Sequence, residues 1–544
     1  YLYGTRNVMY DQEGYPELNM AGKDGQDLSW NHTSRASAGY FGRINYDYKG
    51  IYLLELNGRY DGSSRFPHTD QWAFFPSASI GYRFSEEAYF APLKHIVSNG
   101  KLRASFGEIG NEAVGDYMFE QLISQRLNNK STGYIYWIEN NNANANLLTM
   151  YNMPDLVSST LTWERIRTLN IGLDLGLLND ELTIGFDWFQ RENRDMLAPA
   201  QVLPNTLGAS APYENAGTLR TRGWELNLNW RHTFGDFDVY ANFNIGDSKT
   251  KVTKWDNDSK LLSTYYTGKT YGDIFGFETD RYFEEKDFTS QNADGSWNYA
   301  NGIASQAGLE SGNFHYGPGD VKFKDLDGNG KIDGGKGTAD DHGDLKVIGN
   351  SMPRYEYSFH LGGAWKGIDL DLYFQGVGKR EDWTTSSLNL PAMVHADVAI
   401  YSHQTSYNKV LWNSDYTAIT GYEVNQGNRY PRLYRGTNNS GGTVSGIANG
   451  CNNYYPQSRY LTDMSYLRLK NVTVGYTLPK EWTRKAYIEK ARIYFSGSNL
   501  FLLHKGNDLP VDPEISTGNG LTAGGWGRIA AIAPTFSFGA QVTL

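Results

Sequence analysis

The feature that most constrains the fold of this chain is an alternation of apolar and polar residues that recurs along most of its length. In the segment 224–231, Trp224, Leu226, Leu228 and Trp230 alternate with Glu, Asn, Asn and Arg. The segments 182–188 and 368–375 alternate in the same way. Successive side chains of a β-strand point to opposite faces, so this period of two predicts strands with one apolar and one polar face.

The pattern predicts about thirteen strands, at 36–48, 51–62, 72–84, 101–109, 163–177, 181–196, 219–233, 236–250, 354–366, 368–380, 466–478, 490–503 and 536–544. Every other connection is compact: 49–50, 85–100, 178–180, 234–235, 366–367 and 479–489. The connections between these are mostly long, near 110–162, 251–353, 381–465 and 504–535. Long and short connections therefore lie at opposite ends of the strands. This predicts an all-β fold, a transmembrane antiparallel β-barrel with short periplasmic turns and long extracellular loops.

The same rhythm predicts an orientation. The last strand, 536–544, follows a long loop, so we expect it to descend and to place the C-terminus in the periplasm. Counting back an odd number of strands places residues 1–33 in an extracellular loop and assigns 34–544 to the barrel. Whole barrels of this kind have an even number of strands and both termini in the periplasm, so we expect this chain to be the C-terminal part of a larger barrel.

Charge and composition exclude several classes of protein. The formal net charge of −10 argues against a nucleic-acid binder, which normally carries a basic patch. A single cysteine, Cys451, makes neither an internal disulfide nor a cysteine metal site. The longest apolar runs are far shorter than the roughly 20 residues of a membrane-spanning helix.

Several segments also resemble those of a known family, the SusC-like TonB-dependent transporters. The matching segments are YFGRINY at 40–46, YLLELNGRYDGSSRF at 52–66, FFPSASIGY at 74–82, KLRASFG at 101–107, VIGNSMPRY at 347–355 and YLRLKNVTVGYTLP at 466–479. The resemblance implies an outer-membrane barrel of roughly 22 strands around a plug, a size class known for transporters of this membrane. About 13 of those strands would lie here, and neither the plug, the TonB-binding segment nor the first strands are among these residues.

The resemblance further implies a function and partners. It implies active import of an oligomeric nutrient into a Gram-negative cell, with energy relayed through TonB. It also implies a SusD-like surface lipoprotein that closes over the barrel as a lid. The family favours glycans as substrates, and peptides remain the alternative within the same type of transporter.

One local motif predicts a calcium site. In the segment 325–333, Asp325, Asp327 and Asn329 offer side-chain oxygens, Lys331 its carbonyl, and Asp333 a carboxylate directly or through water. This spacing matches the first part of an EF-hand loop, with Gly330 at the sharp turn. The closing Glu is replaced by Lys336, so Asp340, Asp341 or Asp344 would complete a structural Ca²⁺ site. The alternative is an acidic turn without a metal.

The long loops are rich in aromatic residues, which with amide and carboxylate neighbours suit sugars and peptides alike. They are Trp137, Trp255, Tyr265, Tyr266, Trp297, Tyr299, Trp383, Trp412, Tyr454, Tyr455 and Trp526. The alternative is packing of loop upon loop or against the lid, so no substrate-binding residue is assigned.

No catalytic motif is found, so we expect no enzyme. Glu108 and Glu112 lie near a strand end, where a solvated loop edge is favoured over a catalytic pair. Two other classes of function remain open, an outer-membrane enzyme barrel and a secreted β-rich carbohydrate-binding protein.

Overall fold

The computed structural model describes residues 33–121, 154, 156–158, 161–199, 212–311, 314–384, 388–391, 400–433, 452–514 and 532–544, together with four short strands. These strands form two pairs, β1 (Leu2–Thr5) with β2 (Asp27–Trp30) and β7 (Gln125–Leu127) with β8 (Thr149–Tyr151). All statements below concern these residues.

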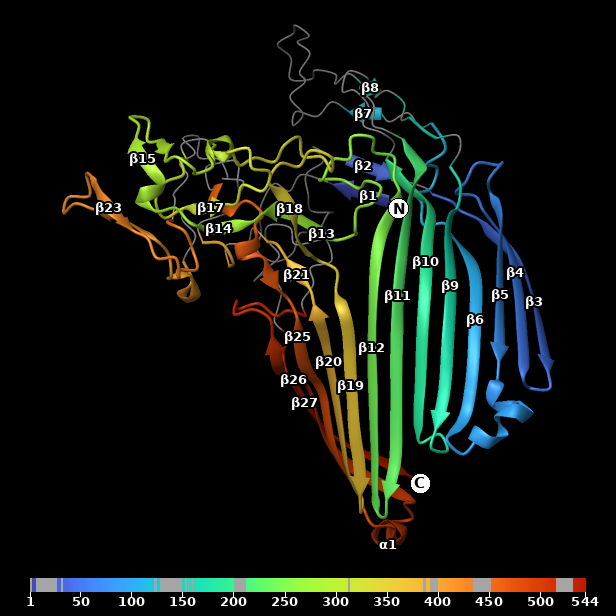
Figure 1. The fold of residues 1–544 in the computed structure, drawn as a ribbon. Helices are drawn as coiled ribbons and strands as arrows, with labels where there is room; N and C mark the ends of the chain where they lie inside the picture. Colours follow the sequence, from blue (N-terminus) through green and yellow to red (C-terminus); the bar gives the residue numbers. More distant parts are fainter. Residues whose placement is uncertain are drawn as a thin grey trace.

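One antiparallel sheet of thirteen strands dominates the structure (Figure 1). Its strands are β3 (Ser37–Tyr48), β4 (Tyr52–Ser63), β5 (Trp72–Tyr82), β6 (Val97–Asn111), β9 (Glu164–Leu177), β10 (Leu182–Pro199), β11 (Tyr213–Phe234), β12 (Phe237–Lys254), β19 (Arg354–Trp365), β20 (Ile368–Lys379), β25 (Tyr466–Thr477), β26 (Lys490–Lys505) and β27 (Thr535–Thr543). Each strand pairs with the next one in this order, and β3 and β27 form the edges. The thirteen predicted strands are confirmed, and β7 and β8 lie outside this sheet.

The strand bounds differ most from the prediction at β11, which begins six residues before the expected position 219. The reason is that β10 and β11 continue to pair with each other above the alternating segment, through a bulge between Asn193 and Leu197. Backbone pairing thus continues where the side-chain pattern has already changed.

Tight turns join the strands at one end of the sheet. Lys49 and Gly50 both have positive φ, 58° and 65°, as do Lys366 and Gly367, 48° and 92°. Two successive residues with positive φ match the right-handed twist of a hairpin, which explains the glycine at the second position. Longer links at this end are the short helices η2 (Phe84–Glu86) and η3 (Ala88–Leu93), and α1 (Lys480–Thr483) with η11 (Arg484–Ala486).

The long connections emerge at the opposite end, as predicted, and the C-terminus lies at the turn end (Figure 1). The loops carry the small sheets β13 (Asp273–Phe277) with β18 (Leu345–Asn350), β14 (Thr279–Tyr282) with β17 (Val321–Phe323), β15 (Phe288–Gln291) with β16 (Trp297–Tyr299), β21 (Glu381–Asp382) with β24 (Thr462–Asp463), and β22 (Lys409–Trp412) with β23 (Ile419–Glu423). The remaining loop helices are η5 (Glu285–Asp287), η6 (Ala307–Leu309), η7 (Ser402–Gln404), η9 (Asn452–Tyr454) and η10 (Ser458–Tyr460).

Register aligns the apolar residues of the large sheet into continuous rows on one face. One row runs from β3 to β19 through Tyr48, Tyr52, Tyr82, Leu102, Leu173, Phe186, Leu226, Ile245 and Tyr357. The next runs from β9 to β26 through Leu175, Ile184, Leu228, Phe243, Phe359, Phe374, Leu469 and Phe501. We call these two rows the apolar belt.

Aromatic clusters flank the apolar face on β3–β5. Trp72 stacks on Tyr40 and Tyr60 near the loop end, with ring centroids 6.1 and 5.0 Å apart. Tyr52 stacks on Tyr82 at 5.3 Å near the turn end. Along β3 the two clusters are eight residues apart, which is about 26 Å of strand. Because strands of membrane barrels tilt by roughly 35–45°, this length spans about 20 Å of height, somewhat less than the apolar band of roughly 25 Å between their aromatic girdles.

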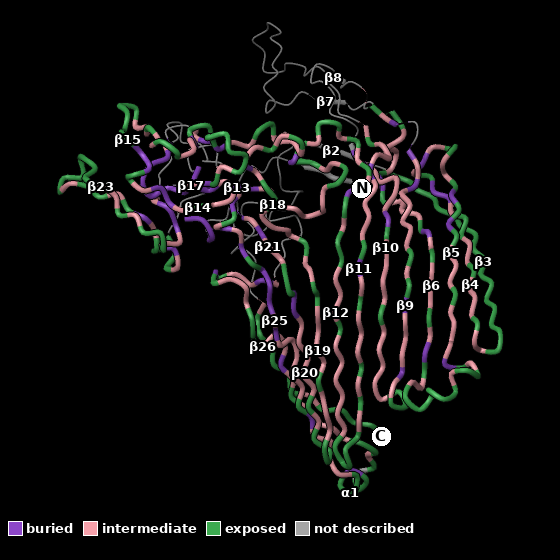
Figure 2. The backbone as a smooth tube through the Cα atoms, in the orientation of Figure 1, coloured by how far each residue is buried: buried purple, intermediate pink, exposed green. Residues whose placement is uncertain are grey.

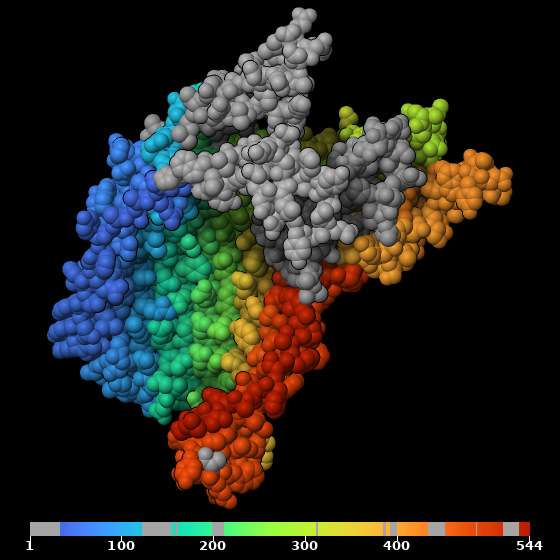
Figure 3. All heavy atoms as spheres, turned by 180° about the vertical axis from the view of Figure 1, so that it is seen from behind, coloured from blue at the N-terminus to red at the C-terminus, as the bar shows by residue number. Residues whose placement is uncertain are grey.

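The large sheet has no buried core against its apolar face, where Ile44 and Ile171 are 66% and 49% exposed. Buried residues concentrate instead in the loops (Figure 2). Seen from behind, the sheet is hollowed between its blue first strands and its red last strands (Figure 3). Among the described residues, no helix is long and apolar enough to cross a bilayer.

The apolar belt makes a direct prediction about stability. Phe243→Lys places a charge in the belt, and we expect it to lower the free energy of unfolding in bilayers by about 2–4 kcal/mol. Asn244→Lys, one residue further on β12 and on the polar face, is the matched control and should cost far less. Urea titration of the reconstituted full-length protein measures both, and equal effects would contradict the assignment of the faces.

Candidate functional site: the polar wall and the loop domain

The polar face of the sheet carries a row of amide and hydroxyl side chains at its centre. Asn227, Asn244, Ser358 and Gln375 lie directly opposite one another on β11, β12, β19 and β20. We call these four residues the polar wall. Because direct cross-strand partners share a face, the wall lies on the side opposite the apolar belt.

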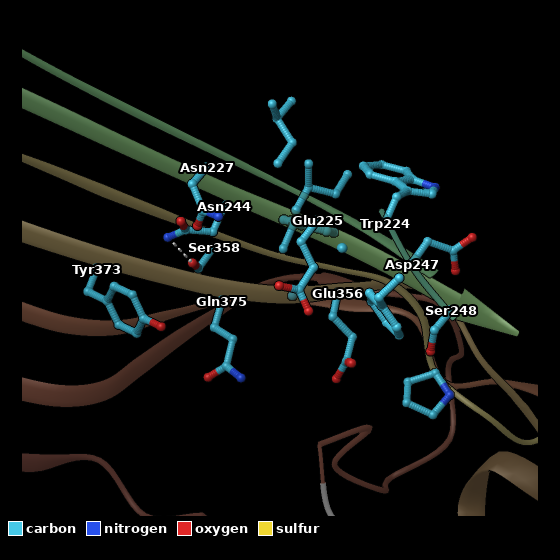
Figure 4. Close-up of a pocket in the computed structure, with 17 residues that line it drawn as sticks. Trp224, Glu225, Asn227, Asn244, Asp247, Ser248, Glu356, Ser358, Tyr373 and Gln375 are labelled. Carbon is cyan, nitrogen blue, oxygen red and sulfur yellow. Dashed lines mark hydrogen bonds between the residues drawn. The ribbon is translucent and has the colours of Figure 1, made fainter. Parts of the chain in front are cut away.

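A groove of about 340 Å³ lies along the wall (Figure 4). Glu225 and Glu356 add carboxylates beside the amides, and Tyr373 adds a ring and a hydroxyl. Asn244 donates a hydrogen bond from Nδ2 to Ser358 Oγ, 3.3 Å away. Unlike the residues of a catalytic site, these groups form an extended polar surface with many donors and acceptors, which suits a polyhydroxylated or amide-rich ligand.

Charged side chains elsewhere on the polar face are paired. Arg103 Nη2 lies 2.6 Å from Asp187 and its Nε lies 3.0 Å from Asp174, linking three strands. Arg492 binds Asp369 in the same manner, at 2.5 Å. These contacts hold neighbouring strands together. They also neutralise the aspartates that the alternating sequence pattern places on this face.

The expectation that Glu108 occupies a solvated loop edge is wrong. Its carboxylate is buried and accepts hydrogen bonds from Arg165 and from Arg167, the latter at 2.6 Å. The arginines come from β9, which pairs with the Glu108 strand only in the folded sheet. Glu112 makes no pair with Glu108; its backbone carbonyl accepts a hydrogen bond from Arg65.

Segments of the two longest loops, 255–353 and 381–465, pack together into one body, which we call the loop domain. Its apolar core contains Tyr282, Phe283, Phe314, Tyr316 and Tyr430, all fully buried. At its centre the fully buried Asp320 accepts hydrogen bonds from Gly317 N, Arg432 Nε and Nη2, and Asn453 Nδ2, at 2.7–2.8 Å. This carboxylate therefore joins segments from both loops. Sequence patterns do not predict this contact, because its side-chain partners Arg432 and Asn453 lie more than 100 residues away.

Most of the loop aromatics proposed for ligand contact serve this core or stack on one another. Trp297, Tyr299, Trp383, Tyr454 and Tyr455 belong to the core or pack on it. Trp255 and Tyr265 contact each other at 4.9 Å, while Lys269 lies over the rings of Tyr265 and Tyr266. Trp412 is 46% exposed. Trp137 and Trp526, like Cys451, lie outside the described residues.

The acidic loop at 325–333 brings three carboxylates together. Oxygens of Asp325, Asp327 and Asp344 lie within 4.8 Å of one another. Of the three aspartates suggested to complete the site, Asp344 lies beside Asp325 and Asp327. Asp340 instead forms an ion pair with Lys260, whose Nζ lies 2.9 Å from Oδ2. Asp344 also accepts hydrogen bonds from Leu326 N and Asp333 N.

The rest of the loop is held by hydrogen bonds within it. Asp325 accepts from Gly328 N and Gly330 N, and both glycines have positive φ. Asn329 Oδ1 accepts from Lys331 N at 2.7 Å, and Asp333 Oδ1 accepts from Gly335 N at 2.8 Å. Such a turn forms with or without a cation, so calcium binding stays a prediction.

One carboxyl group of the loop domain has a strongly altered pKa. Asp382 on β21 is buried, and burial raises its pKa from 3.8 to about 6, although Arg380 Nη2, 2.9 Å away, acts in the opposite direction. Desolvation thus outweighs the ion pair at this position.

Comparison with known proteins identifies the family. The family model described as "TonB dependent receptor-like, beta-barrel" matches residues 1–340. The chain belongs to this family.

The relatives of this receptor barrel match nearly all of it. TonB-dependent receptor P3 of Formosa agariphila is 27% identical over 95% of the chain and 46% of its own length. TonB-dependent receptor SusC of Bacteroides thetaiotaomicron is 25% identical over 89% of the chain and 42% of its own length. The chain thus spans somewhat less than half the length of the curated relatives it matches.

Among solved structures, the RagAB peptide transporter superimposes with a TM-score of 0.63 and 18% identity, over 94% of the chain and 48% of the other chain. At this identity the similarity concerns the fold of the receptor barrel. It confirms the predicted fold class and agrees with the SusC-like resemblance of the sequence.

The acidic loop of the receptor barrel yields a prediction on metal binding. We expect the full-length protein to bind Ca²⁺, and Asp327→Ala to weaken binding by at least about tenfold through loss of a charged ligand. Lys331→Ala should have little effect because its carbonyl is the expected ligand, and Asp415→Ala, an exposed loop carboxylate, is the control. Calorimetric titration of chelator-treated protein measures this. Absence of binding heat in the wild type would favour the metal-free turn.

Asp382 yields a prediction on pH. An acid whose folded pKa is raised holds its proton in the folded state while the unfolded state has lost it. Stability therefore falls as pH rises from about 4 to about 6, by at most about 3 kcal/mol. The stability difference between wild type and Asp382→Asn should change across this window, and that for Asp415→Asn should not. Thermal unfolding of the full-length protein at several pH values measures both differences, and a constant difference for Asp382→Asn would contradict the raised pKa.

Proposed function

We propose that this chain forms the larger part of the wall and mouth of an outer-membrane importer for oligomeric nutrients, with a polar lumen and lipid around its apolar belt. The observation that carries the proposal is the division of the sheet into two faces at the same height. The apolar belt is exposed and needs a non-aqueous environment, whereas the polar wall behind it needs water or a polar ligand.

In this arrangement the loop end faces outward and the C-terminus lies in the periplasm. The edges β3 and β27 have unpaired backbone groups along one side, which lipid does not satisfy. Further strands of a longer protein would pair with them to close a barrel of roughly 22 strands, the size class of plugged outer-membrane transporters. The plug and the segment that engages TonB would belong to that remaining part.

The loop domain would form the mouth and receive a SusD-like lipoprotein as its lid. Its folded core supports this role, because a lid needs a surface of fixed shape to close against. The similarity to the TonB-dependent receptor SusC, at 25% identity, favours this partner.

We propose neutral glycans as the substrates. Most of the polar side chains that line the groove are uncharged amides and hydroxyls, which match the hydroxyl groups of sugars. Peptides are the second candidate, because the RagAB structures with the same fold are described as a peptide transporter. The aspartates that pair with Arg103 and Arg492 elsewhere on the polar face give an enzymatic function no support.

The test is uptake by cells that lack the native gene and carry the wild-type or a variant transporter. We expect wild-type cells to deplete neutral oligosaccharides from the medium faster than a tryptic peptide mixture. Replacing Asn227, Asn244 and Gln375 together by Leu removes three sets of hydrogen bonds and should slow glycan uptake by about tenfold or more. Ile245→Leu, on the lipid-facing side, is the control. Depletion of peptides alone would replace glycans by peptides, and depletion of neither would overturn the import proposal.

A further inference from the structure

On the face of the sheet that carries the apolar belt, the side chains change from apolar to charged toward the loop end. Above the apolar belt comes a row with Ala104, Ile171, Trp188 and Trp224, and then one with Phe106, Leu169, Gln190, Arg222 and Lys249. The row above that is Glu108, Arg167, Glu192, Arg220 and Lys251. Uninterrupted register between Glu108 and Lys251 puts all of them on the face of the apolar belt.

These rows and their neighbours form a basic belt. Its basic members are Arg165, Arg167, Arg194, Arg220, Arg222, Lys249, Lys251 and Arg354, and its carboxylates are Glu108, Glu192 and Asp247. The belt is therefore strongly positive in a chain whose formal net charge is −10. A local charge opposite to that of the whole molecule points to a specific anionic neighbour.

The carboxylates of the basic belt are already neutralised within it. Glu108 binds Arg165, and it binds Arg167 at 2.6 Å. Glu192 binds Arg194 and Arg220, each at 2.6 Å. Asp247 binds Arg354. No carboxylate is left over for the remaining cations.

Three exposed cations of the basic belt have no carboxylate partner among the described residues. They are Arg222, Lys249 and Lys251. Arg222 donates from Nε to Gln190 Oε1 at 2.7 Å, which leaves its other nitrogens free to bind an anion. Arg222 lies directly opposite Lys249, and Arg220 lies directly opposite Lys251. Like charges in such cross-strand positions repel each other, so an external anion between them would stabilise the sheet.

The height of the basic belt identifies the anion. Arg222 and Lys249 lie one row above Trp224 and Asp247, about 7 Å along the strand. Tryptophan marks the boundary between acyl chains and headgroups, so the cations lie at the level of the headgroups. Toward the first strands of the sheet, an apolar groove of about 530 Å³ lies on β3–β6 and β9, with Ala104 and Ile171 in its lining, and can receive an acyl chain.

We propose that the basic belt binds the phosphate groups of an outer-leaflet glycolipid, whose acyl chains cover the apolar belt below. This inference rests on the proposed function, since it requires the loop end to face outward. A phosphorylated amphiphile satisfies both features at once, whereas free phosphate leaves the apolar surface without a partner.

The test uses the full-length transporter in nanodiscs that contain a diphosphorylated glucosamine lipid or its dephosphorylated form. The variant combines Arg222→Gln, Lys249→Gln and Lys251→Gln. The control removes three positive charges at the turn end, with Lys366→Gln, Arg484→Gln and Lys485→Gln. Bound glycolipid is counted by native mass spectrometry after release from the nanodisc.

We expect the wild type and the control to retain the phosphorylated lipid. The basic-belt variant should bind it about tenfold to a hundredfold more weakly, and the dephosphorylated lipid should bind weakly to all three. Equal retention by the variant, or an equal loss in the control, would overturn the proposal. If excess inorganic phosphate displaces the lipid, the basic belt is a simple anion site and the proposal is overturned. If the variant loses a copurifying lipoprotein and keeps the lipid, the belt binds a protein partner instead.

An uptake assay in cells distinguishes failure of the lipid-binding proposal from failure of the transport function on which it rests. Because the three residues lie outside the groove, the basic-belt variant should still import nutrient while it loses lipid. If the protein binds the lipid normally but imports nothing, the lipid-binding proposal stands and only the proposed transport function is overturned.

Discussion

Backbone hydrogen bonds between neighbouring strands hold this molecule together, and they impose its other properties. A sheet one layer thick has two faces and no interior, so each strand must present a different chemistry to each side. Because pairing runs from β3 to β27 without interruption, the side chains of thirteen strands align into rows. The apolar belt, the polar wall and the basic belt are three consequences of this one register.

The same constraint explains where buried residues lie. The sheet cannot build a hydrophobic core, since its apolar face is turned toward lipid. A conventional core forms instead in the loop domain, where apolar side chains surround the fully buried Asp320 and its partner Arg432. The protein thus combines a sheet whose apolar face is exposed with a loop domain that has its own buried core.

Charged side chains are distributed differently on the two faces of the sheet. On the polar face, Arg103 and Arg492 neutralise aspartates between strands. The groove beside the polar wall is lined by amides, hydroxyls and the carboxylates of Glu225 and Glu356. On the face of the apolar belt, basic residues outnumber carboxylates above the row of Trp188 and Trp224. The two distributions occur on the same strands, and they are the basis of the two proposals made above, a neutral substrate on the polar face and an anionic lipid on the other.

Sequence by itself determined the strands, their two faces, the segregation of long and short connections and the family resemblance, because alternation and turn residues are local properties. It also located the acidic loop, but Asp344 was one of three equivalent closing ligands until the fold brought it to Asp325 and Asp327. Only tertiary structure decided that the loop aromatics form a core, that Glu108 is buried between two arginines, and that Arg222 faces Lys249. Those facts depend on register and on contacts between distant segments, and no local pattern encodes either.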